Sequence, residues 1–272
     1  MGKLLDSLFR KFGGGADFDA PLAPDQPFLV IGDIHGQLEA LDATLDQIAS
    51  DPDHANLPLV FVGDYMDRGP HSAGVLRRVM ALQADDPRDI ICLRGNHEQM
   101  LSSFLDNPPL NAPVWFANGG VETLKSFGIG VTKLDMRGDR VLMVRERLKQ
   151  ELGDAALSFL QSLPTVWQTG NVAVVHAGAD PVAPIEEQED DVLVWGHADF
   201  RSQPRQDGIW VVHGHTIVPD VRVRQGRISV DTGAYQTGTL PTVSVSAQGV
   251  HVLGQGGSQQ IWPDNTDPHE AS

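Results

Sequence analysis

The chain has little cysteine, no long apolar stretch and little positive charge, and each shortage excludes a class of protein. The single cysteine, Cys92, rules out a disulfide framework, and its apolar neighbours predict a small buried thiol. No apolar stretch approaches the roughly 20 residues that cross a bilayer as a helix. The 20 Lys and Arg against 36 Asp and Glu give a formal net charge of −16, which argues against general affinity for nucleic acid or anionic membranes.

The 272 residues suffice for one large α/β domain, which we predict to span residues 28–253. Residues 1–27 are predicted to be a tail, with a short amphipathic helix at 3–12 that could contact a membrane surface and then a Gly- and Pro-rich linker. Residues 98–170 are predicted to be a helical insertion that walls a cleft. The polar residues 254–272 predict a disordered tail. Without an export signal, the expected location is the cytoplasm.

The first half of the domain shows a repeating strand and helix pattern. Short apolar runs at 28–31, 59–62 and 90–93 predict buried strands, and apolar stripes at 37–49 and 71–84 predict the helices between them. Short crossovers of this kind require a parallel sheet. Further strands are predicted at 171–175, 208–212, 221–224, 227–230, 242–245 and 250–253, and insertion helices at 98–105, 120–127 and 154–163.

Polar residues with metal-binding chemistry follow five of these predicted strands. Because the carboxyl ends of neighbouring parallel strands meet at one edge of a sheet, we expect these side chains to converge. Carboxylate, imidazole and amide groups together suit divalent metals, and an aspartate between neighbouring strands can bridge two of them. The sequence therefore predicts a metal-dependent hydrolase. The candidate ligands are Asp33, His35, Asp64, Asn96, His176 and His215.

Five motifs within residues 28–245 then carry a family resemblance: G-D-x-H-G, G-D-x-x-D-R-G, L-R-G-N-H-E, V-H-A-G and H-G-H-T. In this order they resemble the calcineurin-like metallophosphoesterases, and within them the phosphoprotein-phosphatase branch, which includes bacterial and phage serine/threonine phosphatases and diadenosine tetraphosphatases. The resemblance implies a four-layer α/β/β/α sandwich with mixed sheets. It also implies two divalent metal ions, for which this donor set favours Mn²⁺, with Fe or Zn²⁺ as alternatives.

The resemblance implies a role for each ligand. Asp33 and His35 would bind the first metal, Asp64 would bridge, and the second metal would be held by Asn96, His176 and His215. In H-G-H-T the ligand is the second histidine, so His213 is expected either to contact substrate or to support the loop.

The same motifs imply the catalytic and substrate-binding residues. His97 would protonate the leaving oxygen, and Asp67 would orient its imidazole and favour the charged form. Arg68 and Arg94 lie at positions where guanidinium groups clamp the phosphate. Tyr235 either lines the cleft or packs beside it.

One segment departs from the family pattern. Related bacterial sequences resemble W-I-R-x-x-F where this chain has Trp195-Gly196-His197-Ala198-Asp199-Phe200, so His197 stands in the place of a phosphate-binding arginine. A histidine side chain ordinarily loses its charge near neutral pH, whereas a guanidinium is always charged. Arg201 or Arg205 could supply the missing cation.

The expected function is a two-metal phosphomonoesterase in which a metal-bridging hydroxide attacks phosphoserine, phosphothreonine or small phosphomonoesters in line. The alternative is a phosphoanhydride hydrolase acting on symmetric dinucleoside tetraphosphates or RNA-cap-like ends, with Trp115, Phe116 and Trp195 as candidates for stacking on a base. A further alternative is a non-catalytic metal-binding interaction module.

Overall fold

The computed structural model describes residues 18–86, 88–132, 138–254 and 257–263. The amphipathic helix predicted at 3–12 lies outside the described residues. The main elements are β1 (Phe28–Ile31), α2 (Leu38–Ser50), β2 (Leu59–Phe61), α3 (Ser72–Asp85), β3 (Ile90–Cys92), α4 (Asn96–Asp106), α5 (Pro108–Trp115), α6 (Val121–Ser126), α7 (Asp139–Ser162), β4 (Val166–Thr169), β5 (Val172–Val175), α8 (Asp190–Trp195), β6 (Trp210–His213), β7 (Arg222–Arg224), β8 (Arg227–Ser229), α9 (Ala234–Thr237), β9 (Thr242–Ser246), β10 (Gly249–Gly254) and β11 (Gly257–Trp262).

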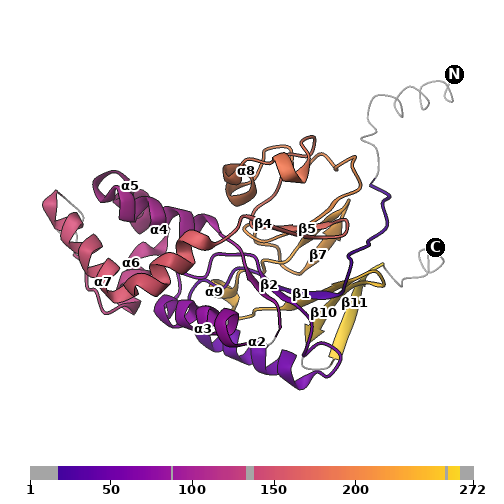
Figure 1. The fold of residues 1–272 in the computed structure, drawn as a ribbon, viewed down its shortest axis with the longest axis horizontal. Helices are drawn as coiled ribbons and strands as arrows, with labels where there is room; N and C mark the ends of the chain where they lie inside the picture. The colour runs from indigo at the N-terminus through magenta and orange to yellow at the C-terminus, as the bar shows by residue number, and fades with distance from the viewer. Residues whose placement is uncertain (1–17, 87, 133–137, 255–256, 264–272) are drawn as a thin grey trace.

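The strands form two mixed sheets that pack face to face (Figure 1). The first sheet has the order β11-β10-β9-β1-β2-β3, and the second has the order β4-β5-β6-β8-β7. Strands β1, β2 and β3 are parallel, as the short crossovers predicted. In the second sheet β5, β6 and β8 are parallel to one another. Several carboxyl strand ends of both sheets therefore meet at one edge of the sandwich.

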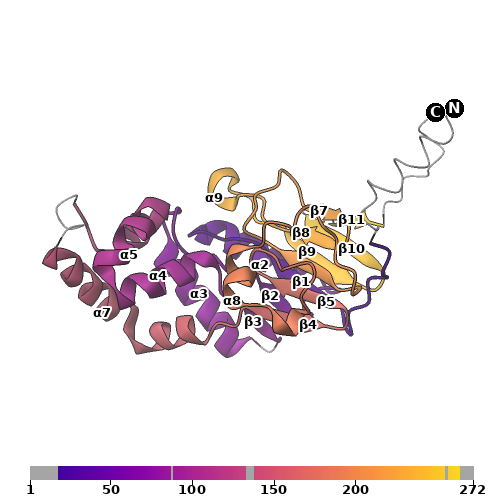
Figure 2. The same ribbon diagram turned by 90° about the horizontal axis from the view of Figure 1, so that it is seen from above.

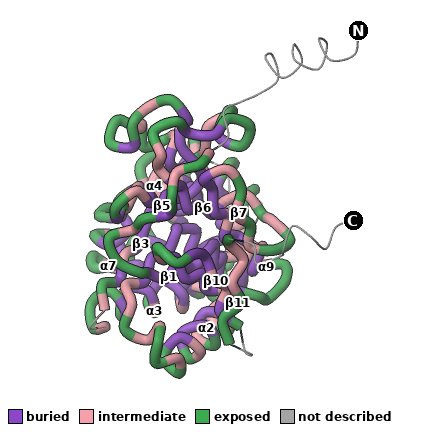
Figure 3. Tube along the Cα trace, turned by 90° about the vertical axis from the view of Figure 1, so that its right-hand side faces the viewer, coloured by how far each residue is buried: buried purple, intermediate pink, exposed green. Residues whose placement is uncertain are grey.

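Apolar residues that alternate along the strands form core layers between the two sheets and between each sheet and its helices. In β1, Phe28 and Val30 face the second sheet, whereas Leu29 and Ile31 face the helices. This alternation follows from the two-residue period of a strand, and it lets one short strand serve two apolar layers. The innermost strands are buried on both faces, as Figure 3 shows for the purple trace of β1, β5 and β6.

Helices cover the outer face of each sheet. α2 and α3 pack on the first sheet through Leu41, Leu45 and Val79, and α8 packs on the second through Leu193. The layers α2/α3, first sheet, second sheet and α8 follow one another in Figure 1. The predicted four-layer α/β sandwich is confirmed.

The insertion between β3 and β4 is helical, as predicted, and lies beyond one end of the sheets (Figure 2). Its longest helix, α7, begins at Asp139, whereas the sequence predicted a helix only at 154–163. The helical run bends at Gly153, which has φ of +71°. α7 contacts α4 and α5, so the insertion is joined to the domain through shared core.

The domain extends further in both directions than the sequence predicted. Residues 257–262 form β11, paired antiparallel with β10, where a disordered tail was predicted. Trp262 in β11 packs against Trp210 with ring centroids 4.9 Å apart, and Phe18 from the predicted linker packs against the same ring at 5.1 Å. Residues 264–272 lie outside the described residues.

Two further predictions concern burial and membrane spans. Cys92 is buried in β3, as predicted, and burial raises the pKa of its thiol to about 12. Among the helices that the structure describes, none is long and apolar enough to cross a membrane.

Candidate metal centre and active site

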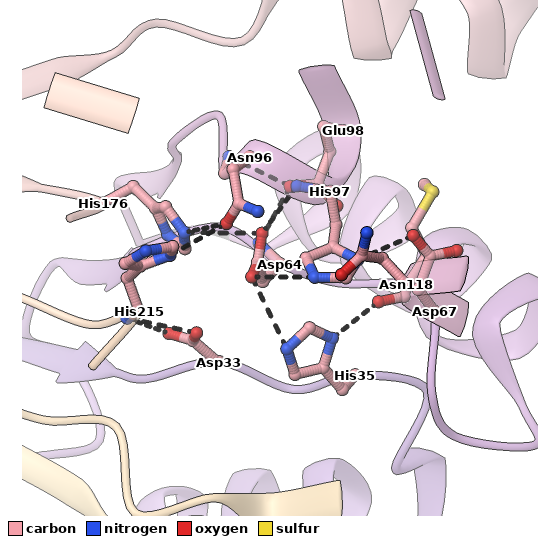
Figure 4. A network of polar contacts seen from close by, with 12 residues as sticks. Asp33, His35, Asp64, Asp67, Asn96, His97, Glu98, Asn118, His176 and His215 are labelled. Atoms are coloured by element: carbon pink, nitrogen blue, oxygen red, sulfur yellow. Dashed lines mark hydrogen bonds and ion pairs between the residues drawn. The ribbon is translucent and has the colours of Figure 1, made fainter. Parts of the chain in front are cut away.

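The candidate ligands gather where five strands end (Figure 4). Asp33 and His35 follow β1, Asp64 follows β2, and Asn96 begins α4, the helix that follows β3. His176 and His215 follow β5 and β6 of the second sheet. The site is therefore built by both sheets and depends on their packing against each other.

The backbone is strained around this cluster. Left-handed φ values between 46° and 68° occur at His35, Asp64, Asp67, Arg68 and His215. Each such residue costs roughly 1–3 kcal/mol unless it is glycine. Among the described residues, the one other such case is Gln225, in a two-residue turn between β7 and β8. Strain concentrated in this way is typical of a functional site.

Asp64 lies at the centre of the cluster. One carboxylate oxygen, Oδ2, is 3.5 Å from Nε2 of His35 and 3.8 Å from Nε2 of His97. The other, Oδ1, is 3.4 Å from Nε2 of His176 and accepts the backbone N–H of His97 at 3.0 Å. The two oxygens thus face two different groups of imidazole nitrogens, which is the arrangement that a bridging ligand requires.

Asn96, His176 and His215 converge on one point beside Asp64. Oδ1 of Asn96 lies 2.9 Å from Nε2 of His176 and 2.9 Å from Nδ1 of His215. Nδ1 of His176 is held by the carbonyl of Val62 at 2.9 Å, so Nε2 is left to face the cluster. Asp64, His176 and His215 offer ligand atoms within 4.8 Å of one another.

Asp33 is placed differently. Both of its carboxylate oxygens accept the backbone N–H of His215 at 3.1 Å. The second three-residue group with ligand atoms within 4.8 Å contains His35, Asp64 and His97, without Asp33. The structure therefore brings Asp33 to the cluster and leaves its predicted place on the first metal untested.

The buried carboxylates of the cluster would be stabilised in their charged form by an added positive charge. Burial raises the pKa of Asp64, and the negative charges of Asp33 and Glu98 raise it further. Burial also raises the pKa of Asp33, and the nearby carboxylate of Asp231 adds to that effect. Arg68 opposes both shifts, but it is one cation beside several buried acids.

The histidines also fit a cation site, because their buried imidazoles are held in the neutral form that binds metals. Burial lowers the pKa of His35 and of His176, so both imidazoles stay neutral and keep a free lone pair. Nε2 of His35 is buried and has no hydrogen-bond partner, while Nδ1 is held by the carbonyl of Met66 at 2.8 Å. A buried nitrogen left without a partner is costly, and a metal ion would satisfy it.

His97 is held by a buried network that reaches into the insertion. Its Nδ1 lies 2.7 Å from Oδ2 of Asp67. Asp67 also accepts the indole N–H of Trp115 at 3.0 Å and the hydroxyl of Thr123 at 2.6 Å. Nε2 of His97 is buried and without a hydrogen-bond partner on the side facing Asp64. The imidazole is thus fixed with one nitrogen aimed into the site.

Burial shifts the pKa values of both groups in this pair. Burial lowers the pKa of His97 to about 3, and the positive charges of Arg68 and His215 contribute. Burial raises the pKa of Asp67 to about 8, against the hydrogen bonds from Thr123 and Trp115. The sequence predicted that Asp67 would favour the charged imidazole. In this environment burial outweighs the attraction between the two groups, and both pKa shifts favour the neutral forms.

Glu98 organises the backbone beneath the ligands. Its buried carboxylate accepts N–H bonds from Asp64 at 2.8 Å, Tyr65 at 2.9 Å and Gly95 at 2.9 Å. Gly95 must be glycine, because a Cβ there would lie 2.2 Å from Oδ1 of Asp64. This glutamate therefore holds the loop that presents Asp64 and, through the first turn of α4, Asn96.

The two candidate clamps have different surroundings. Arg68 is half-buried, and its guanidinium lies 4.8 Å from the centre of the Tyr235 ring. The Tyr235 ring is also nearly perpendicular to the imidazole of His35, with 5.4 Å between their centroids. Tyr235 therefore lies beside the cluster and orients Arg68. In contrast, Nη2 of Arg94 donates to the carbonyl of Leu163 at 3.0 Å, just after α7. Its role as a clamp stays a prediction.

His197 lies in a pocket of about 280 Å³ that also reaches His215, Trp195 and Arg201. Arg205 cannot supply the missing cation, because its guanidinium is buried, pairs with Asp207 and donates to two backbone carbonyls. Arg201 remains, since it is exposed and lines the pocket.

Two candidate residues have structural roles. Trp115 is fully buried on Asp67, so it cannot stack on a base. Trp195, at 44 % exposure, still can. His213 supports the loop: its Nδ1 lies 3.0 Å from the carbonyl of Gly214 and its Nε2 lies 2.9 Å from the hydroxyl of Ser229.

Comparison with known proteins agrees with this geometry. The profile of the family described as calcineurin-like phosphoesterase matches residues 26–219. The chain is 26% identical over 228 residues to the asymmetrical bis(5'-nucleosyl)-tetraphosphatase PrpE of Bacillus velezensis, covering 75% of this chain and 83% of that protein. It is 27% identical over 223 residues to serine/threonine-protein phosphatase 2 of Escherichia coli, covering 78% and 89%.

Among solved structures, a putative diadenosine tetraphosphatase has the same fold, with a TM-score of 0.57 and 19% identity over 90% of this chain and 100% of that one. The strand-end cluster, the two mixed sheets and the profile match over most of the domain lead to one conclusion. The chain belongs to the calcineurin-like phosphoesterase family and is a metal-dependent phosphoesterase.

Proposed function

We propose that the protein is a two-metal phosphomonoesterase that acts on phosphoserine, phosphothreonine or small phosphomonoesters. The observation that carries this proposal is the position of His97. Its unpartnered Nε2 lies 3.8 Å from Oδ2 of Asp64, and its Nδ1 is anchored on Asp67. The imidazole thus stands beside the candidate metal ligands, and the negative charge of a bound phosphate would favour the protonated form that a general acid needs.

Each residue of the site has a role in this proposal. Asp64 would be shared by two metal ions, with His35 and Asp33 on one side and Asn96, His176 and His215 on the other. Such ions, for which Mn²⁺ suits the donor set, supply Lewis acidity and make the attacking water more acidic. Arg68 stabilises the charge on the phosphoryl oxygens, with Tyr235 fixing its guanidinium. Nε2 of His97 delivers the proton to the leaving oxygen, and Asp67 holds the ring.

Phosphoanhydride hydrolysis is the second candidate, because one relative is named as a dinucleoside tetraphosphatase and because the pocket beside His215 contains the exposed Trp195. An indole in that position could stack on a base. The loss of Trp115 as a stacking residue weakens this candidate. A non-catalytic module is disfavoured, because the acid, its anchor and the ligand cluster are all assembled. A cytoplasmic location stays a prediction.

Side-by-side rates decide between the candidates. Turnover of p-nitrophenyl phosphate, a phosphoserine peptide and diadenosine tetraphosphate would be measured with Mn²⁺ on the same preparation. The proposal expects kcat/KM for the phosphopeptide to exceed that for the dinucleotide. The reverse order would establish the anhydride hydrolase. If none of the three substrates were hydrolysed, the non-catalytic interaction module would be the remaining candidate.

His197 gives a separate test of substrate contact. If it faces the phosphate, His197→Arg should add a charge-assisted hydrogen bond of about 1.5–3 kcal/mol, so KM should fall roughly tenfold or more at pH 8, where an imidazole is ordinarily neutral. If Arg201 already binds the phosphate, His197→Arg should do little and Arg201→Gln should raise KM instead. An unchanged KM in both variants would show that this segment does not touch the substrate.

A further inference from the structure

A second basic pocket lies next to the candidate active site, in a protein whose formal net charge is −16. It has a volume of about 100 Å³ and shares two lining residues, Arg201 and Thr216, with the pocket beside His215. Among the described residues that line it, none is acidic. The cations around it are Arg201, Arg222, Arg224 and Arg227.

The strand register explains why these arginines converge. Arg222 and Arg224 are two residues apart in β7, so their side chains lie on one face of the strand. The turn at Gln225 and Gly226, both with positive φ, then places Arg224 directly opposite Arg227 of β8. Like charges opposite each other in adjacent strands destabilise a sheet. This pairing therefore has a cost that calls for an explanation.

In the described part of the chain, no acidic side chain lies within ion-pair distance of these arginines. None of the ion pairs found there involves any of the four arginines. Arg227 is buried, and its guanidinium donates to neutral oxygens: the carbonyls of Phe200 at 2.7 Å and Gln203 at 3.1 Å, and the side chain of Gln225 at 2.9 Å. It is held firmly in place without an acidic partner, and burial and the positive charge of Arg224 lower its pKa.

His213 contributes no charge of its own. The Gly214 carbonyl can only accept, so Nδ1 of His213 carries the proton and Nε2 accepts from Ser229. The floor of the pocket is thus polar and neutral, and its positive charge comes from guanidinium groups.

The volume of the pocket and its arginine lining indicate which kind of group it binds. A volume of about 100 Å³ is roughly that of three water molecules in the liquid, which suits a single tetrahedral anion and is too small for a nucleoside. Guanidinium groups bind phosphate oxygens in a bidentate manner and are the usual partners of phosphate. Because the pocket adjoins the one at His215, a group held there can belong to a substrate whose other phosphate is in the active site.

We propose that the four-arginine pocket binds a second phosphate group of the substrate, so that the enzyme prefers peptides carrying two phosphorylated side chains. This inference rests on the proposed phosphomonoesterase function. The pocket adds affinity and is not part of the chemistry.

The test compares singly and doubly phosphorylated peptides, with the second phosphoserine at one to six residues from the first. The wild type is compared with Arg222→Gln/Arg224→Gln, which changes two exposed side chains, and with Arg140→Gln/Lys149→Gln, which removes the same charge from the distant exposed surface of α7. For at least one spacing, wild-type KM should be about tenfold lower for the doubly phosphorylated peptide. The pocket variant should lose this preference while the control keeps it, and kcat/KM for p-nitrophenyl phosphate should stay within about twofold in all three.

Several outcomes overturn the proposal. One is a wild type without preference at any spacing, and another is a preference that survives in the pocket variant or disappears equally in the control. A pocket that serves free phosphate or RNA would show arginine-dependent binding of inorganic phosphate or an oligonucleotide without the peptide preference. If no substrate is hydrolysed, the proposed function fails separately. Calorimetric binding of the two peptides then tests the pocket alone, and an arginine-dependent preference would still support it.

Discussion

Replacing Asp64 with asparagine is expected to reduce turnover by more than about 10³-fold and to lower the number of bound metal ions. Asparagine has nearly the same shape, and its amide oxygen can still accept the backbone N–H of His97 that Oδ1 now accepts at 3.0 Å. The backbone bonds from Asp64 and Tyr65 to Glu98 do not involve the changed atoms. The loss should therefore come from charge and ligation, with the fold preserved.

Metal analysis and a thermal unfolding curve would accompany the rate measurement. Asp42→Asn is the matched control, because Asp42 lies on α2 and pairs with Arg78 at 3.0 Å, away from the cluster. Two fully bound ions together with near-normal turnover in Asp64→Asn would rule out the bridging role.

Replacing His97 with asparagine should slow substrates in proportion to how poor their leaving group is. A general acid contributes about 10²–10⁴-fold where the departing oxygen needs a proton, and little where the leaving group is already a stable anion. His97→Asn should therefore cost a phosphoserine peptide far more than p-nitrophenyl phosphate. The measurement is the ratio of the two kcat/KM values in wild type and variant.

A structural role for His97 predicts a different pattern. Because Asp67, Trp115 and Thr123 hold the ring, a collapse of this network would slow both substrates alike. Thr123→Val removes one hydroxyl from the network and leaves the imidazole, so it serves as the comparison. Equal losses on both substrates in His97→Asn would show that the histidine only supports the loop.

The meeting place of the ligands at the strand ends was predictable from the sequence. Asp33, Asp64 and Asn96 follow three parallel strands, so their convergence needs only the sheet topology. The anchors of Asp67 could not be predicted in this way. Trp115 and Thr123 are 48 and 56 residues away in sequence, on insertion helices whose packing no local pattern reveals.

Two other features of the structure were missed by the sequence analysis for reasons that can be named residue by residue. β11 carries the polar run Gly257-Ser258-Gln259-Gln260, which gives no strand signal, and it forms because the edge of β10 and the Trp262 contact with Trp210 hold it there. The sequence placed Glu98 in a motif without a role, because backbone N–H groups as its partners are visible only in three dimensions.

The most direct test of the account is a titration of metal-free protein with Mn²⁺, in which bound metal per chain and turnover of p-nitrophenyl phosphate are followed together. Turnover should be negligible without metal and should reach its maximum when two ions are bound per chain. Full turnover in the presence of a strong chelator, or saturation of the rate at a single bound ion, would contradict it.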